Sequence, residues 1–472
     1  MALDADRIRS SVDERWDRDV LAPLQDYMRI PNVSPAFDPA WEANGHMAAA
    51  TELVRSWCEA RPIDGLRVQV LELAGRTPVV LCEIPATDPD LGDDTVLLYG
   101  HLDKQPEMSG WRDGLGPWEP VVEGDLLYGR GGADDGYAVF AAFSAIEALR
   151  DAGGRHARLL VMVEASEESG SPDLPAHLEA LGDRLGQVTL VVGLDSGAAT
   201  YDRLWVTTSL RGLLMATVRV QVLEEGVHSG SAGGVVPSSF RILRRLLDRI
   251  EDADTGRVLL DELWCPVPPE REAQLAANAD QIVGGMAFPW ADRTRADHSD
   301  AVSLLRARTW EPSIATIAVG GFPPPDRAGN VLRPFTELTL SCRLAPVADP
   351  SAAADALVRA LTADPPNGAT VTVSVRGAEQ GWNAPPTAGW LQDAVNQASE
   401  AHWGQPSAAM GEGGTIPFMA MLGAQFPEAQ FLITGVLGPG SNAHGPNEFL
   451  HLPMARRIAA AVSHVLDAHA RR

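Results

Sequence analysis

Hydrophobic residues in the first two hundred positions follow two spacings. Apolar side chains recur every three or four residues over 5–29, 41–60 and 138–150, which predicts amphipathic helices. Short runs of apolar and β-branched residues predict strands, and these runs cover residues 67–73, 79–84, 95–99, 158–163 and 188–194. Helices that alternate with buried strands are typical of an α/β domain around a central sheet.

The middle of the chain has a different pattern. Apolar and polar residues alternate over 213–222, which predicts a strand with one solvated face. Further strand-like and helical runs follow, at residues 314–319, 335–343 and 370–375 for the strands and 238–250 and 351–362 for the helices. The proline-rich segment 262–300 is not assigned.

Alternation of helices and strands returns after Pro385, over residues 390–403, 416–422, 431–434 and 453–470. We therefore expect an α/β domain with a mixed central sheet flanked by helices, built from residues 1–208 and 385–472. Residues 209–384 are expected to form an inserted α+β domain with an antiparallel sheet.

Composition excludes several classes of function. The 63 acidic and 38 basic residues give a net charge of −25, which argues against a nucleic-acid-binding protein. Lys104, the only lysine, lies in no G-x-x-x-x-G-K-[ST] motif, so a P-loop nucleotide site is excluded. The charged N-terminal residues do not resemble a signal peptide, and no apolar run approaches the roughly 18 residues of a membrane span. Four cysteines without a C-x-x-C pair indicate free thiols. We expect a soluble cytoplasmic protein that binds neither nucleic acid nor membranes.

Acidic and imidazole side chains follow the predicted strands and their turns. Ligands of open α/β sheets gather at the carboxyl ends of the strands. Histidine together with carboxylate is the ligand chemistry of zinc and similar divalent ions. The residues that form this set are His101, Asp103, Asp134, Glu167, Glu168, Asp195 and His444.

Each of these residues has an ordinary structural explanation when it is considered alone. Asp134 could cap a helix, Glu167 and Glu168 could lie in a solvated turn, and His444 could be a loop histidine. Together they favour a metal site, because so many of them follow strands of one sheet. Adjacent carboxylates repel unless a cation lies between them, which suits one glutamate as a ligand and the other as a base.

These motifs resemble the family of co-catalytic di-metal aminopeptidases, carboxypeptidases and aminoacylases. That family includes carnosinases, cytosolic dipeptidases and glutamate carboxypeptidases. The resemblance covers nearly the whole chain, and Asp195 makes it most similar to the dipeptidase and carnosinase branch. The matching motifs are Gly100-His101-Leu102-Asp103, Gly129-Arg130-Gly131 with Asp134-Asp135, Glu167-Glu168-Ser169-Gly170-Ser171, Asp195 and His444.

The resemblance implies two divalent metal ions per chain, zinc first, with manganese and cobalt as alternatives. Glu167 is implied as the general base, and Asp103 as the residue that orients a metal-binding histidine. A cis peptide is implied after the bridging aspartate, between Asp134 and Asp135. The implied ligands are His101 and Asp195 for one ion, Glu168 and His444 for the other, and Asp134 between the two.

The inserted domain is implied to be a lid that binds substrate. Asn330 and Arg343 have the family's spacing for gripping a substrate carboxylate. His228 resembles the lid histidine that reaches into the active site of a dimer partner, which implies a homodimer. Gly414 and Thr415 lie in a segment similar to the substrate-binding glycine loop.

The expected activity is hydrolysis of an amide bond in dipeptides or small peptides with a free C-terminal carboxylate. An aminoacylase acting on N-acyl amino acids is the alternative. A dinucleotide-binding protein has weak support from G-x-G-x-x-A over residues 438–443, because Pro446 interrupts the helix that should follow. An inactive scaffold is disfavoured by the intact Glu167, and no G-x-S-x-G supports a serine hydrolase.

The chain departs from the family pattern at two places. Gly136 and Tyr137 follow Asp134-Asp135, where the family usually has lysine and then glycine. An unusual run of prolines precedes Asn330, over residues 323–326. Neither departure removes one of the implied ligands or the implied base.

Overall fold

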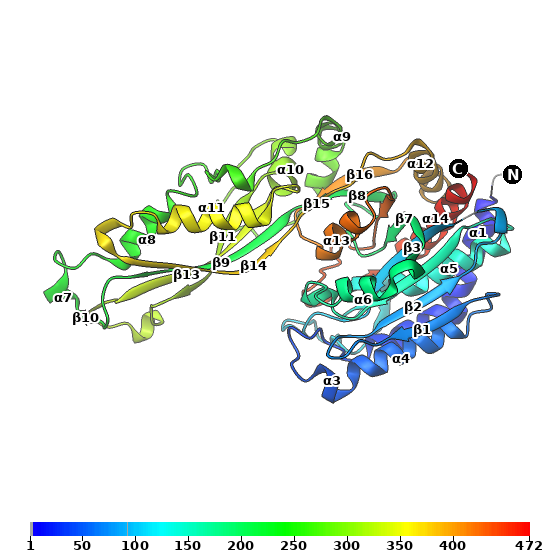
Figure 1. Cartoon of the computed structure of the whole chain (residues 1–472), viewed down its shortest axis with the longest axis horizontal. Coiled ribbons are helices and arrows are strands. Elements are labelled where there is room, and N and C mark those ends of the chain that lie inside the picture. The colour runs from blue at the N-terminus through cyan, green and yellow to red at the C-terminus, as the bar shows by residue number, and fades with distance from the viewer. Residues whose placement is uncertain (1–2, 92) are drawn as a thin grey trace.

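The computed structural model describes residues 3–91 and 93–472, and its larger domain is built around a six-stranded sheet (Figure 1). Four neighbouring strands, β6, β3, β7 and β17, run parallel, whereas β2 is antiparallel to both of its neighbours. The sheet is therefore mixed, as expected. In sheet order the strands are β1 (Arg67–Leu71), β2 (Val79–Ile84), β6 (Arg158–Glu164), β3 (Asp94–His101), β7 (Gln187–Gly193) and β17 (Gln430–Ile433).

Helices cover both faces of this sheet because alternate strand residues point to opposite sides. Leu98 packs in one hydrophobic cluster, while Leu97 and Tyr99 pack in the other. The first face is covered by α1 (Ala5–Arg15), α2 (Leu21–Met28), α4 (His46–Glu59), α5 (Tyr137–Asp151), α12 (Gly389–Trp403) and α14 (Leu452–Arg471). The second face is covered by α6 (Leu174–Leu181) and α13 (Pro417–Gln425).

The two predicted N-terminal helices differ in continuity. Residues 5–28 are helical throughout, with one wider turn at Trp16–Val20 between α1 and α2. The predicted helix over 41–60 breaks into α3 (Trp41–Asn44) and α4, because Gly45 has a φ of 75° and cannot continue a right-handed helix.

The inserted domain has a four-stranded antiparallel sheet, as expected (Figure 1). On β9 the predicted alternation is present, since Ala216 and Val218 are buried while Arg219 and Gln221 are half-buried. The strands in sheet order are β11 (Ser313–Gly320), β13 (Phe335–Leu344), β9 (Gly212–Gln221) and β14 (Thr370–Glu379). One face of the sheet packs against α8 (Ser239–Leu247) and α11 (Pro350–Thr362). At the far end, β10 (Val227–His228) pairs with β12 (Val331–Leu332) beside α7 (Ser229–Ala232).

Two segments that lie side by side connect the domains. A Cβ atom at Gly212 would lie 2.7 Å from the carbonyl oxygen of Glu379, and one at Gly381 would lie 2.6 Å from that of Leu210. Glycine is therefore required for the two segments to approach this closely. The adjoining three-stranded sheet contains β15 (Trp382–Asn383), β8 (Trp205–Leu210) and β16 (Ala408–Glu412).

The unassigned segment 262–300 contains a long helix, α9 (Pro269–Gly285), and is followed by α10 (Ala301–Thr309). Leu275, Ala279 and Ile282 of α9 belong to the core of the larger domain. Although α9 lies within the inserted sequence, it packs beside β16 (Figure 1). The segment thus reaches back from the inserted domain to the larger one.

The larger domain contains a buried lysine and a small antiparallel sheet. Lys104 is fully buried, and its Nζ donates hydrogen bonds to the carbonyl oxygens of Tyr27, at 2.8 Å, and Ile30, at 2.7 Å. Burial lowers the pKa of Lys104 well below its usual range.

In the described ranges, 3–91 and 93–472, we find no helix both long and apolar enough to span a bilayer. The small sheet is formed by β18 (Phe449–His451), β5 (Leu126–Tyr128) and β4 (Val121–Glu123).

Candidate metal centre

The carboxyl ends of three parallel strands bring the first candidate residues together. His101 is the last residue of β3, Glu167 follows β6, and Asp195 follows β7. Because β6, β3 and β7 are neighbours in the sheet, these side chains meet at one edge. His101 Nε2 lies 3.7 Å from an oxygen of Asp195.

Asp134 is held by an irregular turn between Gly132 and Gly136 that leads into α5. The peptide bond between Asp134 and Asp135 is cis, as the family resemblance implied. A Cβ atom at position 136 would lie 2.1 Å from Tyr27 Cε1, so the larger residue at this point of the family pattern would not fit here. This first departure from the pattern is explained by the close packing of Tyr27.

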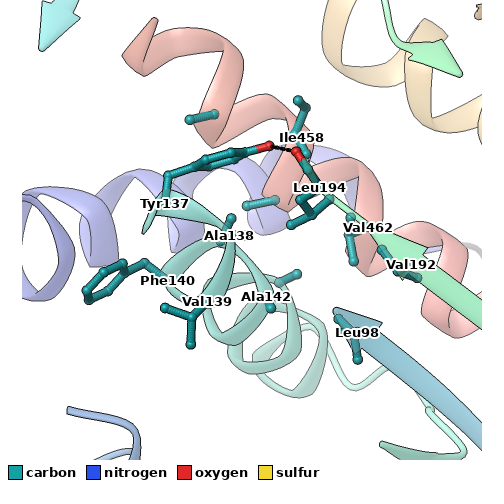
Figure 2. Packing of buried hydrophobic residues seen from close by; sticks show 14 of the residues in the cluster. Leu98, Tyr137, Ala138, Val139, Phe140, Ala142, Val192, Leu194, Ile458 and Val462 are labelled. Atoms are coloured by element: carbon teal, nitrogen blue, oxygen red, sulfur yellow. Dashed lines mark hydrogen bonds between the residues drawn. The ribbon is translucent and has the colours of Figure 1, made fainter. Parts of the chain in front are cut away.

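Tyr137 belongs to the same departure from the family pattern, and its side chain links two parts of the site. Its hydroxyl donates a hydrogen bond of 2.5 Å to the carbonyl oxygen of Leu194, next to Asp195 (Figure 2). Figure 2 shows the tyrosine at the start of α5, above the apolar residues that pack this helix against β3 and β7. The interaction ties the backbone near Asp134 to the backbone near Asp195.

His444 is brought to the site by a loop that a buried ion pair anchors. The guanidinium of Arg130 contacts Glu448 at 2.5 Å and donates a second hydrogen bond to the carbonyl oxygen of Gly445 at 2.9 Å. Glu448 also accepts from the main-chain N–H of Gly131 at 2.9 Å. The glycine-rich turn of Asp134 and the loop of His444 are therefore linked.

The site contains two groups of side chains that could each hold a metal ion. One group is His101, Glu167 and Asp195, and the other is Asp134, Glu168 and His444. Asp134 lies between the groups, because one of its oxygens is 3.3 Å from His101 Nε2 and the other is 2.9 Å from His444 Nε2. His444 Nε2 is also 3.3 Å from Glu168.

The chemistry of these donors fits divalent cations. Among the described residues, the buried atoms His101 Nε2 and Glu168 Oε1 have no hydrogen-bond partner. Burial raises the pKa of Glu167 and of Glu168 well above the usual range, and the charges of neighbouring carboxylates add to the increase. A cluster of carboxylates this deeply buried requires positive charge, which divalent ions would supply.

Asp103 holds the main chain of two of these candidate ligands in place. Its two carboxylate oxygens accept hydrogen bonds from the main-chain N–H groups of Glu167, at 3.1 Å, and Glu168, at 3.0 Å. His101 Nδ1 lies 3.5 Å from the carboxylate but only 3.1 Å from the main-chain oxygen of Asp103. Asp103 therefore fixes the main chain of Glu167 and Glu168 through its carboxylate, and its main-chain oxygen lies next to the ring of His101.

A cavity of about 470 Å³ opens onto the ligand groups. It is lined by residues of the glycine loop as well, so Gly414 and Thr415 face the same space as Glu167. Arg343 donates a hydrogen bond of 3.0 Å to the hydroxyl of Thr415. The structure thus brings Arg343 of the inserted domain to the edge of the candidate site.

His228 and Asn330 are not brought to the metal centre. Both are exposed, and they lie together at the far end of the inserted domain, on or beside β10 and β12 (Figure 1). Ser229 donates from its main-chain N–H to the carbonyl oxygen of Asn330 at 2.9 Å. The two residues are neighbours of each other but not of the ligand groups.

Sequence reasoning missed the residues of α9 and α10 that line the cavity. Met286 and Phe288 follow the end of α9. A guanidinium nitrogen of Arg308 on α10 lies 3.8 Å from a carboxylate oxygen of Glu412, and both residues line the cavity. Glu412 begins the segment that resembles the glycine loop, whereas Arg308 is far from it in the sequence and belongs to no motif. The apolar spacing of α9 was the only available signal.

Fold and centre together define a metallohydrolase in which a second domain is inserted beside the active site. The chain belongs to the peptidase family M20/M25/M40, whose family model matches residues 97–468. The resemblance inferred from the motifs is therefore confirmed.

Relatives include the cysteinylglycine-S-conjugate dipeptidase of Corynebacterium striatum. It is 28% identical over 379 residues, which are 79% of this chain and 80% of the relative. Human carnosine dipeptidase 1 superposes with a TM-score of 0.77 at 21% identity, covering 99% of both chains. The di-peptidase Dug1p from Saccharomyces cerevisiae superposes with a TM-score of 0.77 at 20% identity, covering 100% of both chains. These structures confirm the expected fold class.

Proposed function

We propose that this protein hydrolyses the peptide bond of dipeptides and small peptides that have a free C-terminal carboxylate. One observation carries the proposal. Glu167 lies among two groups of candidate metal ligands, next to His101 and Asp195, in a cavity that is also lined by Thr415, the hydrogen-bond partner of Arg343. The similarity to a cysteinylglycine-S-conjugate dipeptidase supports a dipeptide substrate.

The proposed ligands divide around Asp134. His101 and Asp195 would hold one ion and Glu168 and His444 the other, with one oxygen of Asp134 turned toward each histidine. Zinc is the proposed metal, because histidine and carboxylate ligands suit it, and manganese and cobalt are the alternatives. When bound, the two ions supply a water of lowered pKa and polarise the substrate carbonyl.

Glu167 is the proposed general base. Its carboxylate is buried at the cavity wall, and its main-chain N–H is fixed by Asp103. It would accept the proton of the attacking water and deliver it to the leaving amine. A raised pKa suits this role, because the group must hold a proton between the two steps.

Arg343 and Thr415 are proposed to bind the substrate's C-terminal carboxylate, together with the main chain at Gly414. A guanidinium can offer a carboxylate two parallel hydrogen bonds, which fixes both position and direction. The Arg343 guanidinium already lies at the glycine loop, where its Nη1 donates to Thr415 Oγ1. Amide-bond cleavage next to a bound carboxylate is the expected result.

A homodimer is proposed to complete each site. His228 and Asn330 lie at the far end of the lid, so we propose that they reach the site of a second copy, where His228 helps to stabilise the oxyanion and Asn330 helps to hold the substrate carboxylate. Strand β11 supports this arrangement, since it is an edge strand with Ile317 56% exposed and Val319 61% exposed. Exposed apolar edge strands are prone to pair with another chain.

Two further assignments complete the proposal. The lid is proposed to span residues 209–384 and to close about the paired segments near Gly212 and Gly381. The cytoplasm is the proposed location, which the free thiols of all four cysteines support.

The test is hydrolysis of dipeptides and N-acetyl amino acids by protein loaded separately with zinc and manganese. Release of free amino acids is measured together with metal content. Rapid cleavage of dipeptides and slow cleavage of N-acetyl amino acids would support the proposal. The opposite preference would favour the aminoacylase alternative, and cleavage of neither class at full metal occupancy would reject both.

A further inference from the structure

A second cavity adjoins the one at the metal centre. It has a volume of about 1040 Å³, compared with about 470 Å³ for the first. Met286, Phe288 and Arg308 line both cavities, so these three residues form the wall between them. A small dipeptide would use the first cavity and leave the second without a role.

The second cavity is lined by exposed aromatic side chains as well as by charged residues such as Arg295 and Asp297. Phe288 is 56% exposed and Trp290 is 53% exposed, and their rings meet edge to face at 5.7 Å. Trp264 lines the same space, and the guanidinium carbon of Arg257 lies 4.5 Å from the centre of its ring. Large aromatic side chains exposed together around a hollow are typical of ligand-binding surfaces.

The position of the wall indicates which part of a substrate it faces. The end of α9 lies against the segment that follows Asp195, because a Cβ atom at Gly285 would lie 3.2 Å from the carbonyl oxygen of Ala199. The proposed carboxylate-binding residues are on other segments, because Thr415 is on the glycine loop and Arg343, which donates a hydrogen bond to it, is on β13. With the C-terminal carboxylate held at Thr415, the N-terminal residue would face other parts of the cavity lining, which include Met286 and Phe288.

We propose that Met286 and Phe288 form a subsite for the side chain of the substrate's N-terminal residue, and that a long apolar side chain passes them into the second cavity. The inference rests on the proposed dipeptidase function and specifies its substrates. Dipeptides with a bulky, apolar or aromatic N-terminal side chain are the preferred class. Burial of apolar area against Phe288 and Trp290 supplies the preference.

The experiment measures kcat/KM for two series with the metal-loaded full chain. In the first series, X-Gly, X is alanine, norleucine, phenylalanine or S-benzylcysteine, and in the second, Gly-X, the same residues occupy the C-terminal position. We expect kcat/KM to rise along X-Gly by at least about tenfold, as added apolar groups in a pocket do. The Gly-X series should change much less.

Three variants locate the effect. Phe288→Ala and Met286→Ala should each remove most of the gain for norleucine and larger residues, measured as the ratio of their kcat/KM to that of Ala-Gly for the same variant. Trp290→Ala, which lines only the second cavity, should lower the value for S-benzylcysteinylglycine alone. Phe240→Ala is the matched control, since Phe240 is 46% exposed on the lid and lines neither cavity.

The outcomes separate this inference from the proposed function. If Ala-Gly is cleaved but X-Gly shows no preference, or if Phe288→Ala and Phe240→Ala behave alike, the subsite is wrong and the dipeptidase function stands. If Phe288→Ala lowers kcat/KM for the Gly-X series instead, the subsite binds the C-terminal side chain and the substrate is bound in the reverse orientation. If no dipeptide is cleaved at full metal occupancy, the proposed function itself fails.

Discussion

The metal centre and the tip of the lid differ in how far one chain assembles them. At the metal centre, His101 and Asp134 are buried and side chains from separate parts of the sequence lie 2.9 to 3.7 Å apart. At the lid tip, His228 and Asn330 are exposed and touch neither a ligand group nor the cavity. The first region is preorganised by the fold, whereas the second remains separate from it in a single chain.

The difference has a structural cause. The metal centre is supported by hydrogen bonds that leave little freedom, including those from Tyr137 to Leu194 and from Arg130 to Gly445. The lid tip rests on a two-residue strand pair, β10 with β12. We therefore expect changes at the metal centre to act on metal and rate within one chain. Changes at the lid tip should act between chains.

The largest effect is expected for Asp134→Ala. Removing the residue between the two ligand groups should release metal and abolish hydrolysis, because both ions lose a ligand. Elemental analysis of the purified variant measures this, with Asp393→Ala on the exposed face of α12 as the control. Retention of two ions per chain would show that Asp134 does not bridge.

Glu167→Gln should lower kcat by about 10²- to 10⁴-fold while metal content stays normal, because the change removes the proton acceptor. Metal analysis and rates are measured on the same sample. Glu179→Gln, an exposed position on α6, should behave as the parent protein. Near-normal turnover would exclude Glu167 as the base, and loss of metal would make it a ligand, as its place beside His101 and Asp195 allows.

His228→Ala should lower kcat by about 10²- to 10³-fold, the usual effect of losing one oxyanion donor. Mixing inactive His228→Ala subunits with inactive Glu167→Gln subunits should restore up to about a quarter of the parent activity, since statistical mixing gives half mixed dimers with one intact site each. Subunit exchange is verified by native mass spectrometry. If mixed dimers form without activity, the partner's His228 does not contribute.

Asp103→Asn should weaken metal binding by about 10- to 100-fold, as changes to residues that support ligands do. The amide keeps the size of the side chain but replaces one hydrogen-bond acceptor of the Glu167 and Glu168 N–H groups with a donor. Zinc affinity is measured by competition with a chelator. An unchanged affinity would mean that the turn holds its shape without the carboxylate.

The smallest effect concerns stability and pH. Burial lowers the pKa of His156 to about 4, of His402 to about 3 and of His469 to about 4, and all three lie in the larger domain. The unfolded chain takes up these protons near pH 6.5, whereas the folded chain does not, so stability is complete above pH 6.5 and is lost as the pH falls toward 4.

Hydrogen exchange of the metal-free protein at pH 7 and pH 5 checks this expectation. From pH 7 to pH 5, the protection of main-chain amides against exchange should fall more in α12 and α14 than in the lid strands β9 and β13. His402→Gln should reduce the pH dependence of the larger domain. Equal loss of protection in both domains would contradict the assignment.

Local patterns were sufficient to predict most of the fold. Alternation of apolar and polar residues identified β9, short apolar runs identified the strands of the central sheet, and the inserted domain followed from the change of pattern. The break at Gly45 and the helix α9 were missed. In α9 the buried positions include alanine and an arginine, Ala279 and Arg271, so its apolar face is faint in the sequence.

Motifs identified the residues that the structure gathers at the metal centre, because most of the motifs follow a strand or precede a helix, while His444 lies in the loop between β17 and β18. They could not show that His228 and Asn330 lie far from that centre, since spacing along the chain does not report lid position. They also gave no indication of the wall formed by Met286 and Phe288. That wall comes from tertiary packing of α9 against another part of the chain.

Lys104 has a practical consequence. It is the only lysine in the sequence, and its ammonium group is enclosed beneath the turn that carries Asp134, where Gly131 packs against its side chain. A lysine-directed acylating reagent can reach it only when this part of the larger domain opens. The rate of acylation at Lys104, followed by mass spectrometry, therefore reports how often the domain opens under native conditions.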